Sequence, residues 1–116
     1  DAYGLCVDAD GNVWAAESEA GILHCLSPEG NLNRSMNIAS FVLTVTAPRD
    51  GYLYGINPEA GRVMKISRAG EIICRFGSEG SGPGQLKLPT GLAVTADGRV
   101  IVADLGNHRL QVFGPR

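Results

Sequence analysis

Residues 4–17, GLCVDADGNVWAAE, return near the end of the chain as residues 91–104, GLAVTADGRVIVAD. A looser copy lies between them, with VLTVT at 42–46 and DGYLYGIN at 50–57. The glycines of the three Asp-Gly pairs, Gly11, Gly51 and Gly98, lie 40 and 47 residues apart. This spacing is in the range of blade-type repeats, so each copy is one supersecondary unit and the chain is an array of them.

Short apolar or β-branched runs alternate with turns in every unit, and helical periodicity is not sustained anywhere. The Asp-Gly pairs join the first two runs of each unit as hairpins, because Asp and Gly tolerate the positive φ of tight primed turns. We therefore predict an all-β chain of eleven strands with essentially no helix. The predicted strands are 5–7, 12–16, 22–26 and 31–38; 42–46, 52–56, 62–66 and 71–76; and 92–95, 99–103 and 110–113.

A β-sandwich has turns at similar intervals, but the repeat period near 40 favours a β-propeller segment of about three four-stranded antiparallel blades. The second strand of a unit is apolar on both faces, as expected of a sheet packed between two others. The predicted units are residues 1–40, residues 41–89 with a long interblade loop at 77–89, and residues 90–116, which lack a fourth strand.

Composition excludes several classes of function. The 116 residues carry a net charge of −2 and contain no long basic run, which argues against nucleic-acid binding. Apolar stretches fall short of the roughly 18 residues that span a bilayer, so a soluble protein without a membrane partner is expected. Cys6, Cys25 and Cys74 each sit in an apolar run and are expected to be buried free thiols, which suits a cytoplasmic protein.

The C-terminal half carries a specific resemblance. FG at 76–77, GSGPGQL at 80–86, LPTGLAV at 88–94 and VADLGNHRLQVF at 102–113 resemble the NHL repeat. Residues 2–30 are similar to the broader group of propellers that includes the gluconolactonase, regucalcin and streptogramin-lyase families, and residues 41–76 fit as a degenerate blade. The resemblance implies a β-propeller, usually six-bladed, that often serves as a binding scaffold.

The enzymes of that group can be compared with this chain residue by residue. Where gluconolactonases and regucalcins have an Asp metal ligand, this chain has Tyr3, and where the peptidyl amidating lyase has a zinc-binding His, it has Thr90. Streptogramin lyases share a Trp-x-x-Glu run like that from Trp14 to Glu17, but their catalytic His has no counterpart here. We therefore expect no catalytic residue, metal site or cofactor within residues 1–116.

Loops after the second and fourth strands of each unit should emerge on one face of the propeller, which is the predicted partner face. Glu17, Asn57 and Asp104 occupy the same place in each unit and could line a cation site. We favour turn caps for these three side chains. The candidate residues of this face are Glu17, Glu19, Asn57, Glu59, Lys87, Asp104 and His108.

Other conspicuous side chains have structural interpretations. Trp14 is expected to fill space between blades, His24 and His108 to pack, and Arg109 to pair with Asp104. The leading hypothesis is a non-enzymatic scaffold that binds a protein or a small polar ligand. The alternative is part of a propeller enzyme, of lactonase or lyase type, whose catalytic residues lie outside this segment.

The carboxylates of the predicted face disfavour a third possibility, RNA recognition. The outer faces of the first and third units are apolar. Closing the ring should therefore require further blades or self-association.

Overall fold

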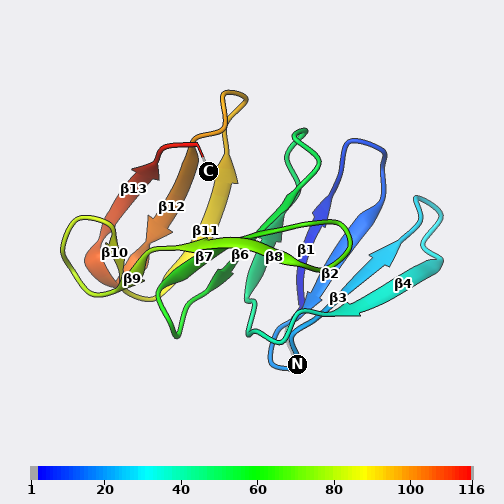
Figure 1. Ribbon diagram of the computed structural model, residues 1–116, viewed down its shortest axis with the longest axis horizontal. Helices are drawn as coiled ribbons and strands as arrows, with labels where there is room; N and C mark the ends of the chain where they lie inside the picture. The colour runs from blue at the N-terminus through cyan, green and yellow to red at the C-terminus, as the bar shows by residue number, and fades with distance from the viewer. Residues whose placement is uncertain (1–2, 116) are drawn as a thin grey trace.

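Three antiparallel sheets follow one another along the chain (Figure 1). The structure is a computed structural model that describes residues 3–115. Sheet 1 contains β1 (Tyr3–Val7), β2 (Val13–Glu17), β3 (Ile22–Leu26) and β4 (Leu32–Asn37), side by side in chain order. Sheet 2 contains β5 (Thr44–Thr46), β6 (Leu53–Asn57), β7 (Arg62–Ile66) and β8 (Ile72–Phe76), and sheet 3 contains β11 (Pro89–Val94), β12 (Val100–Asp104) and β13 (Arg109–Phe113). The predicted all-β fold with an incomplete last sheet is confirmed.

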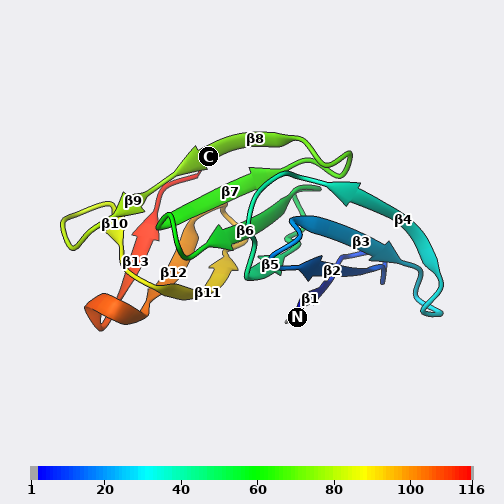
Figure 2. The ribbon, with the colours of Figure 1, turned by 90° about the horizontal axis from the view of Figure 1, so that it is seen from below.

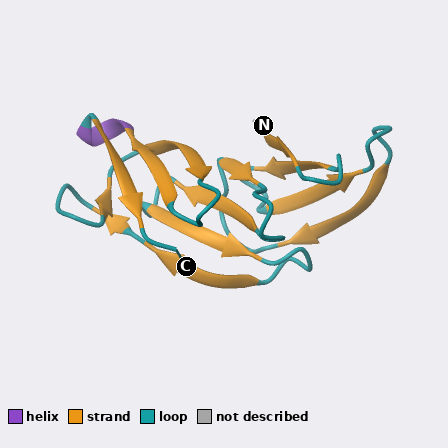
Figure 3. Cartoon of the chain, turned by 90° about the horizontal axis from the view of Figure 1, so that it is seen from above, coloured by secondary structure: helices purple, strands orange, loops and turns teal. Residues whose placement is uncertain are grey.

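The linker between sheets 2 and 3 has more structure than predicted. It contains β9 (Ser78–Glu79) and β10 (Gln85–Leu86), which pair in parallel, so the described residues form thirteen strands instead of eleven. The extra pair forms because the linker folds back on itself, with the Gly80 N–H donating to the Leu86 carbonyl at 3.1 Å. The single helical turn, η1 (Leu105–Asn107), is visible in Figure 3, and no helix within residues 3–115 is long enough to cross a bilayer.

The ends of the strands form two rims. The Asp-Gly turns of the three sheets point to the top of Figure 1, and with the turns after β3 and β7 they make the turn rim. The loops after β2, β6 and β12, together with the linkers that follow β4 and β8, make the linker rim. The first strand of sheet 2, β5, lies against both β1 and β11, the first strands of the other two sheets, while β4 and β8 run along the outer margin in Figure 2. This is the arrangement of propeller blades around an axis.

Two apolar clusters hold consecutive sheets together. Between sheets 1 and 2, Trp14 and Leu23 pack against Leu53 and Met64. Trp14 is only 1 % exposed, so its predicted packing role is confirmed. Between sheets 2 and 3, the cluster contains Tyr54, Ile56, Val63, Leu86, Val100, Val102 and Phe113. Sheet 2 therefore buries both of its faces, one against each neighbour.

The position ten residues after each Asp-Gly glycine has a left-handed backbone in all three sheets. It is Gly21 (φ +67°), Gly61 (φ +62°) and His108 (φ +53°). A different linker passes close to each glycine. A Cβ on Gly21 would lie 2.7 Å from the carbonyl oxygen of Ser40, in the linker between sheets 1 and 2, and a Cβ on Gly61 would lie 2.8 Å from Cα of Glu79, in the linker between sheets 2 and 3. Glycine is therefore required there both by backbone conformation and by the approach of another backbone segment.

We expect Gly61→Ala to be much more destabilising than Gly30→Ala. Both glycines have positive φ, so both substitutions carry backbone strain of about 1 kcal/mol. Only at Gly61 does the added methyl meet backbone atoms, which should raise the cost to roughly 3 kcal/mol. Urea denaturation of the two variants measures the difference. Equal costs would mean that the linker crossing tolerates a side chain.

Candidate functional site

Asp104 lies at the end of β12 with its carboxylate completely shielded from water. Its Oδ1 accepts the Lys87 N–H at 2.7 Å, and its Oδ2 accepts bonds from Asn107 Nδ2 at 2.9 Å and Arg109 Nε at 2.9 Å. Gln111 Nε2 donates to the same Oδ2 at 3.1 Å. The predicted Arg109–Asp104 ion pair is confirmed, and the carboxylate is fully engaged in bonds within the protein.

The donors around Asp104 also hold the linker. Arg109 Nη2 donates to the carbonyls of Gly82 and Gln85 at 2.9 and 2.8 Å, and Asn107 Nδ2 donates to the Gly80 carbonyl at 3.0 Å. These bonds fix residues 80–87 against sheet 3. The linker is therefore an ordered part of the linker rim, and Asp104 has a structural role in holding it there.

The two residues at the matching position of sheets 1 and 2 behave differently. Asn57 Oδ1 accepts the N–H groups of Glu59 and Ala60 at 3.1 and 3.2 Å, which is the turn cap predicted for it. Glu17 makes a contact with the neighbouring strand, in which its Oε1 lies 3.1 Å from His24 Nε2. The three side chains therefore have different partners: Asn57 caps a turn, Glu17 contacts His24, and Asp104 holds the linker.

A carboxylate–imidazole–hydroxyl row runs across sheet 1. Glu17 contacts His24, and the other ring nitrogen of His24, Nδ1, lies 2.7 Å from the hydroxyl of Ser35. Sequence spacing did not indicate this row, because its members come from three strands. The Glu17–His24 pair occupies the positions that Asp104 and Gln111 occupy in sheet 3, so the row is the counterpart of a structural pair.

The remaining predicted residues are exposed on the linker rim. Glu19, Glu59 and the side chain of Lys87 face water. His108 is exposed as well, so the prediction that it packs is wrong. Its role lies in the backbone: it caps η1 with left-handed geometry, and its N–H donates to the Leu105 carbonyl at 3.0 Å.

A second buried carboxylate, Asp8, was missed by the sequence analysis. Its Oδ2 accepts Trp14 Nε1 at 2.9 Å and Arg68 Nη1 at 3.0 Å, and its Oδ1 accepts two backbone N–H groups. Arg68 also donates from Nε to the Gly51 carbonyl, so it ties sheet 2 to sheet 1 at the turn rim. In the matching place, near the Asp-Gly glycines of sheets 1 and 3, lie Pro28 and Pro115. The sequence did contain one sign of this contact, because Arg68 stands at a position where the other two units have Pro.

The comparisons with known proteins bear on the Asp104 motif. The NHL repeat family matches residues 86–113, which contain Asp104 and the donors on β13. Residues 86–113 are an NHL repeat. Human E3 ubiquitin-protein ligase TRIM32 is 54 % identical over 39 residues, which is 34 % of this chain and 6 % of that protein. Mouse peptidyl-glycine alpha-amidating monooxygenase is 29 % identical over 96 % of this chain and 13 % of its own length.

A solved structure of streptogramin B lyase shares the fold. Its TM-score is 0.76 at 18 % identity, covering 97 % of this chain and 37 % of that one. The chain thus spans 6 % and 13 % of the length of the two curated relatives and 37 % of the lyase. At this level of identity the lyase shows the propeller fold alone.

Electrostatics follow from the two buried carboxylates. Burial alone would raise the pKa of Asp104, but the bonds from the Lys87 N–H, Asn107, Arg109 and Gln111 outweigh it and lower that pKa to about 2. The pKa of Asp8 is lowered in the same way, with bonds from Trp14, Asn12 and the Asp10 N–H outweighing burial. Both carboxylates are therefore ionised at neutral pH.

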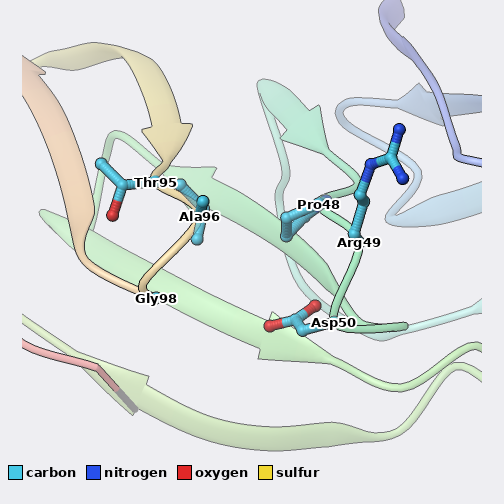
Figure 4. Close-up of a pocket in the computed structure, with 7 residues that line it drawn as sticks. Pro48, Arg49, Asp50, Thr95, Ala96 and Gly98 are labelled. Carbon is cyan, nitrogen blue, oxygen red and sulfur yellow. The ribbon is translucent and has the colours of Figure 1, made fainter.

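A pocket of about 300 Å³ opens between the Asp-Gly turns of sheets 2 and 3, on the turn rim (Figure 4). Asp50 points across it toward the facing turn, whereas the Arg49 side chain extends away. Asp50 is already bonded to Tyr54 Oη at 2.8 Å, and the rest of the lining is small and mostly apolar. The pocket thus lies on the rim opposite the predicted face.

Candidate metal ligands and thiols are dispersed over the described part of the chain. Within residues 3–115, no three His, Cys, Asp or Glu side chains gather closely enough to hold a metal ion. The three cysteines are free, with Cys25 buried and Cys6 and Cys74 half-buried. Burial, aided by nearby Asp8, raises the pKa of Cys6 to about 11, which keeps it a thiol at neutral pH.

Acid should test the Asp104 site. An unfolded Asp titrates near pH 3.9, so a folded pKa of about 2 contributes stability that is complete above about pH 4 and is lost as the pH falls toward about 2. Asp104→Asn removes this titration. The free energy of unfolding of the wild-type protein should therefore fall more steeply over that interval than that of the variant. Parallel slopes in urea titrations would contradict the lowered pKa.

Removing Asp8 should cost more than removing its partner. Asp8→Ala leaves buried Trp14 Nε1 and Arg68 without their acceptor, and we expect a loss of about 3 kcal/mol. Arg68→Ala leaves Asp8 with its other donors, so the loss should be about half as large. Asp97→Ala, at the exposed Arg99–Asp97 pair, is the control and should cost less than about 1 kcal/mol. Equal losses for Asp8→Ala and Asp97→Ala in urea denaturation would contradict the role of Asp8.

Proposed function

We propose that this chain is part of a non-enzymatic propeller scaffold that binds a protein through its linker rim. The observation that supports this proposal most strongly is that the carboxylates of that rim differ in burial. The Asp104 carboxylate is buried and bonded to the Lys87 N–H and to Arg109, whereas the side chains of Glu19, Glu59 and Glu79 are exposed. A rigid surface with free carboxylates fits a partner segment that carries Lys or Arg.

The rigidity of this rim favours binding over chemistry. Residues 80–87 are fixed by side-chain bonds from Asn107, Arg109 and Gln111, so a partner meets a surface that is already ordered. Preorganisation lowers the entropy cost of association. Loops on a fixed scaffold are also where side chains vary at least cost to stability.

A second candidate is part of a propeller enzyme whose catalytic residues lie outside residues 1–116. It is favoured by the similarity to the amidating monooxygenase over nearly the whole chain. The Glu17–His24–Ser35 row is insufficient for acyl transfer on its own. It lies on a sheet whose backbone N–H groups are engaged in the ladder, which leaves few donors for an oxyanion.

Paired charge removal tests the proposed rim. Fluorescence anisotropy would measure the affinity of a labelled Lys-Gly peptide for the wild type and for Glu19→Gln/Glu59→Gln, which should bind roughly tenfold more weakly. The control is Glu29→Gln/Glu71→Gln, which removes two exposed carboxylates from the turn rim and changes the net charge equally. We expect its affinity to change less than about twofold.

The control pair avoids Arg68, because that residue holds Asp8 and its loss would confuse binding with stability. If the turn-rim variant loses affinity and the linker-rim variant keeps it, the wrong rim has been chosen. If both lose it equally, the peptide responds to net charge alone and the proposal fails.

A further inference from the structure

The turn rim has an ion pair at one junction between sheets and a hollow at the other. Between sheets 1 and 2, Arg68 donates from Nη1 to Asp8 at 3.0 Å and from Nε to the Gly51 carbonyl at 3.0 Å. Its guanidinium group therefore bridges the first turns of these two sheets. Between sheets 2 and 3, the corresponding turns border the hollow of about 300 Å³ seen in Figure 4, which we call the turn-rim pocket.

The repeat register explains why this second junction is hollow. Counted from the Asp-Gly glycine of each sheet, Pro48 is the counterpart of Asp8. Pro115 is in the same way the counterpart of Arg68. A proline side chain has neither a charge nor a hydrogen-bond donor, so both partners of the ion pair are missing at this junction. The pocket thus marks the place that a guanidinium group fills between sheets 1 and 2.

A carboxylate is nevertheless present in the pocket. Asp50 points across it toward the facing turn, whereas Arg49, the one cationic residue of the lining, extends away. Two donors hold the Asp50 carboxylate in this orientation, the Tyr52 N–H at 3.0 Å and Tyr54 Oη at 2.8 Å. The ion pairs found among residues 3–115 do not include Asp50, so its charge has no cationic partner there.

The rest of the lining matches the other parts of an Arg side chain. Gly98 is the counterpart of Gly51 and has the same left-handed backbone, with φ +88° against +89°. Its carbonyl is therefore the equivalent of the one that accepts Arg68 Nε at the other junction. Apolar atoms of Pro48 and Val94 form part of the wall and can cover the methylene stem of such a side chain.

The pocket lies between two sheets that both belong to the described chain. Its walls are the turns around residues 48–50 and 94–98, which are not part of the outer face of sheet 1 or of sheet 3. Further blades would pack on those outer faces and not in this junction. Its volume is at the lower end of the range for ligand pockets, roughly 300–1,000 Å³, which fits a single side chain.

We propose that the turn-rim pocket binds the guanidinium group of an Arg side chain presented by a partner protein. The Asp50 carboxylate and the Gly98 carbonyl replace the two acceptors that hold Arg68 at the other junction. A planar guanidinium can donate to both at once, whereas the ammonium group of Lys is a compact point charge. Asp50 lies on the rim opposite Glu19 and Glu59, so this inference stands or falls separately from the proposed function.

An NMR titration tests the pocket. The probe is a Gly-Arg-Gly peptide with blocked ends, and the amide signals of Thr95, Ala96 and Gly98 should shift with it in a saturable way. A blocked Gly-Lys-Gly peptide should bind roughly fivefold more weakly, because an ammonium group cannot match the two acceptors in a plane. Free arginine should also bind more weakly than the blocked Arg peptide, because its own carboxylate is repelled by Asp50.

Two variants separate the effect of charge from that of shape. Asp50→Asn removes the charge and keeps an oxygen that can accept the Tyr52 N–H, and the affinity for the Arg peptide should fall about tenfold. Ala96→Leu fills the hollow without changing any charge and should also weaken binding. Asp10→Asn, at the matching exposed position of sheet 1, is the control and should change the affinity less than about twofold. Circular dichroism and urea denaturation would establish that the three variants fold.

Several outcomes would overturn the proposal. Absence of saturable shifts would show that the pocket does not bind the Arg peptide. Equal affinities for the Arg and Lys peptides, or equal losses for Asp50→Asn and Asp10→Asn, would mean attraction by net charge alone. Tighter binding of free arginine than of the blocked peptide would exclude a protein segment as the ligand. Arg116 follows Pro115 in the sequence, and binding of the peptide by Arg116→Ala alone would mean that the chain fills the pocket itself.

Discussion

A carboxylate removed from water must be surrounded by donors, and this requirement is met once at each junction between sheets. Asp8 meets it with Arg68 at 3.0 Å, across the junction of sheets 1 and 2. Asp104 meets it with Arg109 at 2.9 Å, against the linker that joins sheets 2 and 3. In both pairs the carboxylate is fully shielded while about a third of the Arg side chain remains exposed. Loss of either carboxylate would leave its buried donors without an acceptor. This should lower the free energy of unfolding more than the loss of an exposed ion pair does.

The two junctions use this device on opposite rims. Asp8 follows a first strand and acts at the turn rim, whereas Asp104 ends a second strand and acts at the linker rim. Apolar clusters fill the space between the two rims. Each pair of neighbouring sheets is therefore held by an apolar core and by one buried carboxylate–Arg pair, which we call a carboxylate lock. The repeat units therefore share a backbone register while they differ in which polar side chain completes each junction. Glu17 and Asn57, in the place of Asp104, make only local bonds.

Sequence periodicity predicted the strands, the Asp-Gly turns and the Arg109–Asp104 pair, because these depend on residues close in the chain. Contacts across long separations were harder to predict. Arg68 lies 60 residues from Asp8, and Asp8 by itself resembles an ordinary turn residue. The strands β9 and β10 are too short to leave a periodic signal, and they form because the linker is clamped by side chains from β13. The error at His108 has a different origin: its motif suggested packing, but the feature that the three units share at this position is a left-handed backbone.

The two carboxylate locks also determine at which surface positions a side chain can change without affecting the fold. Glycine is required where linkers cross Gly21 and Gly61, and donors are required around Asp8 and Asp104, so substitutions there affect the fold first. The exposed side chains Glu19, Glu59 and Glu79 carry no such requirement and lie on loops held by these fixed points. A repeat scaffold can therefore change its partner by changing loop residues, while the carboxylate locks preserve the spacing between sheets.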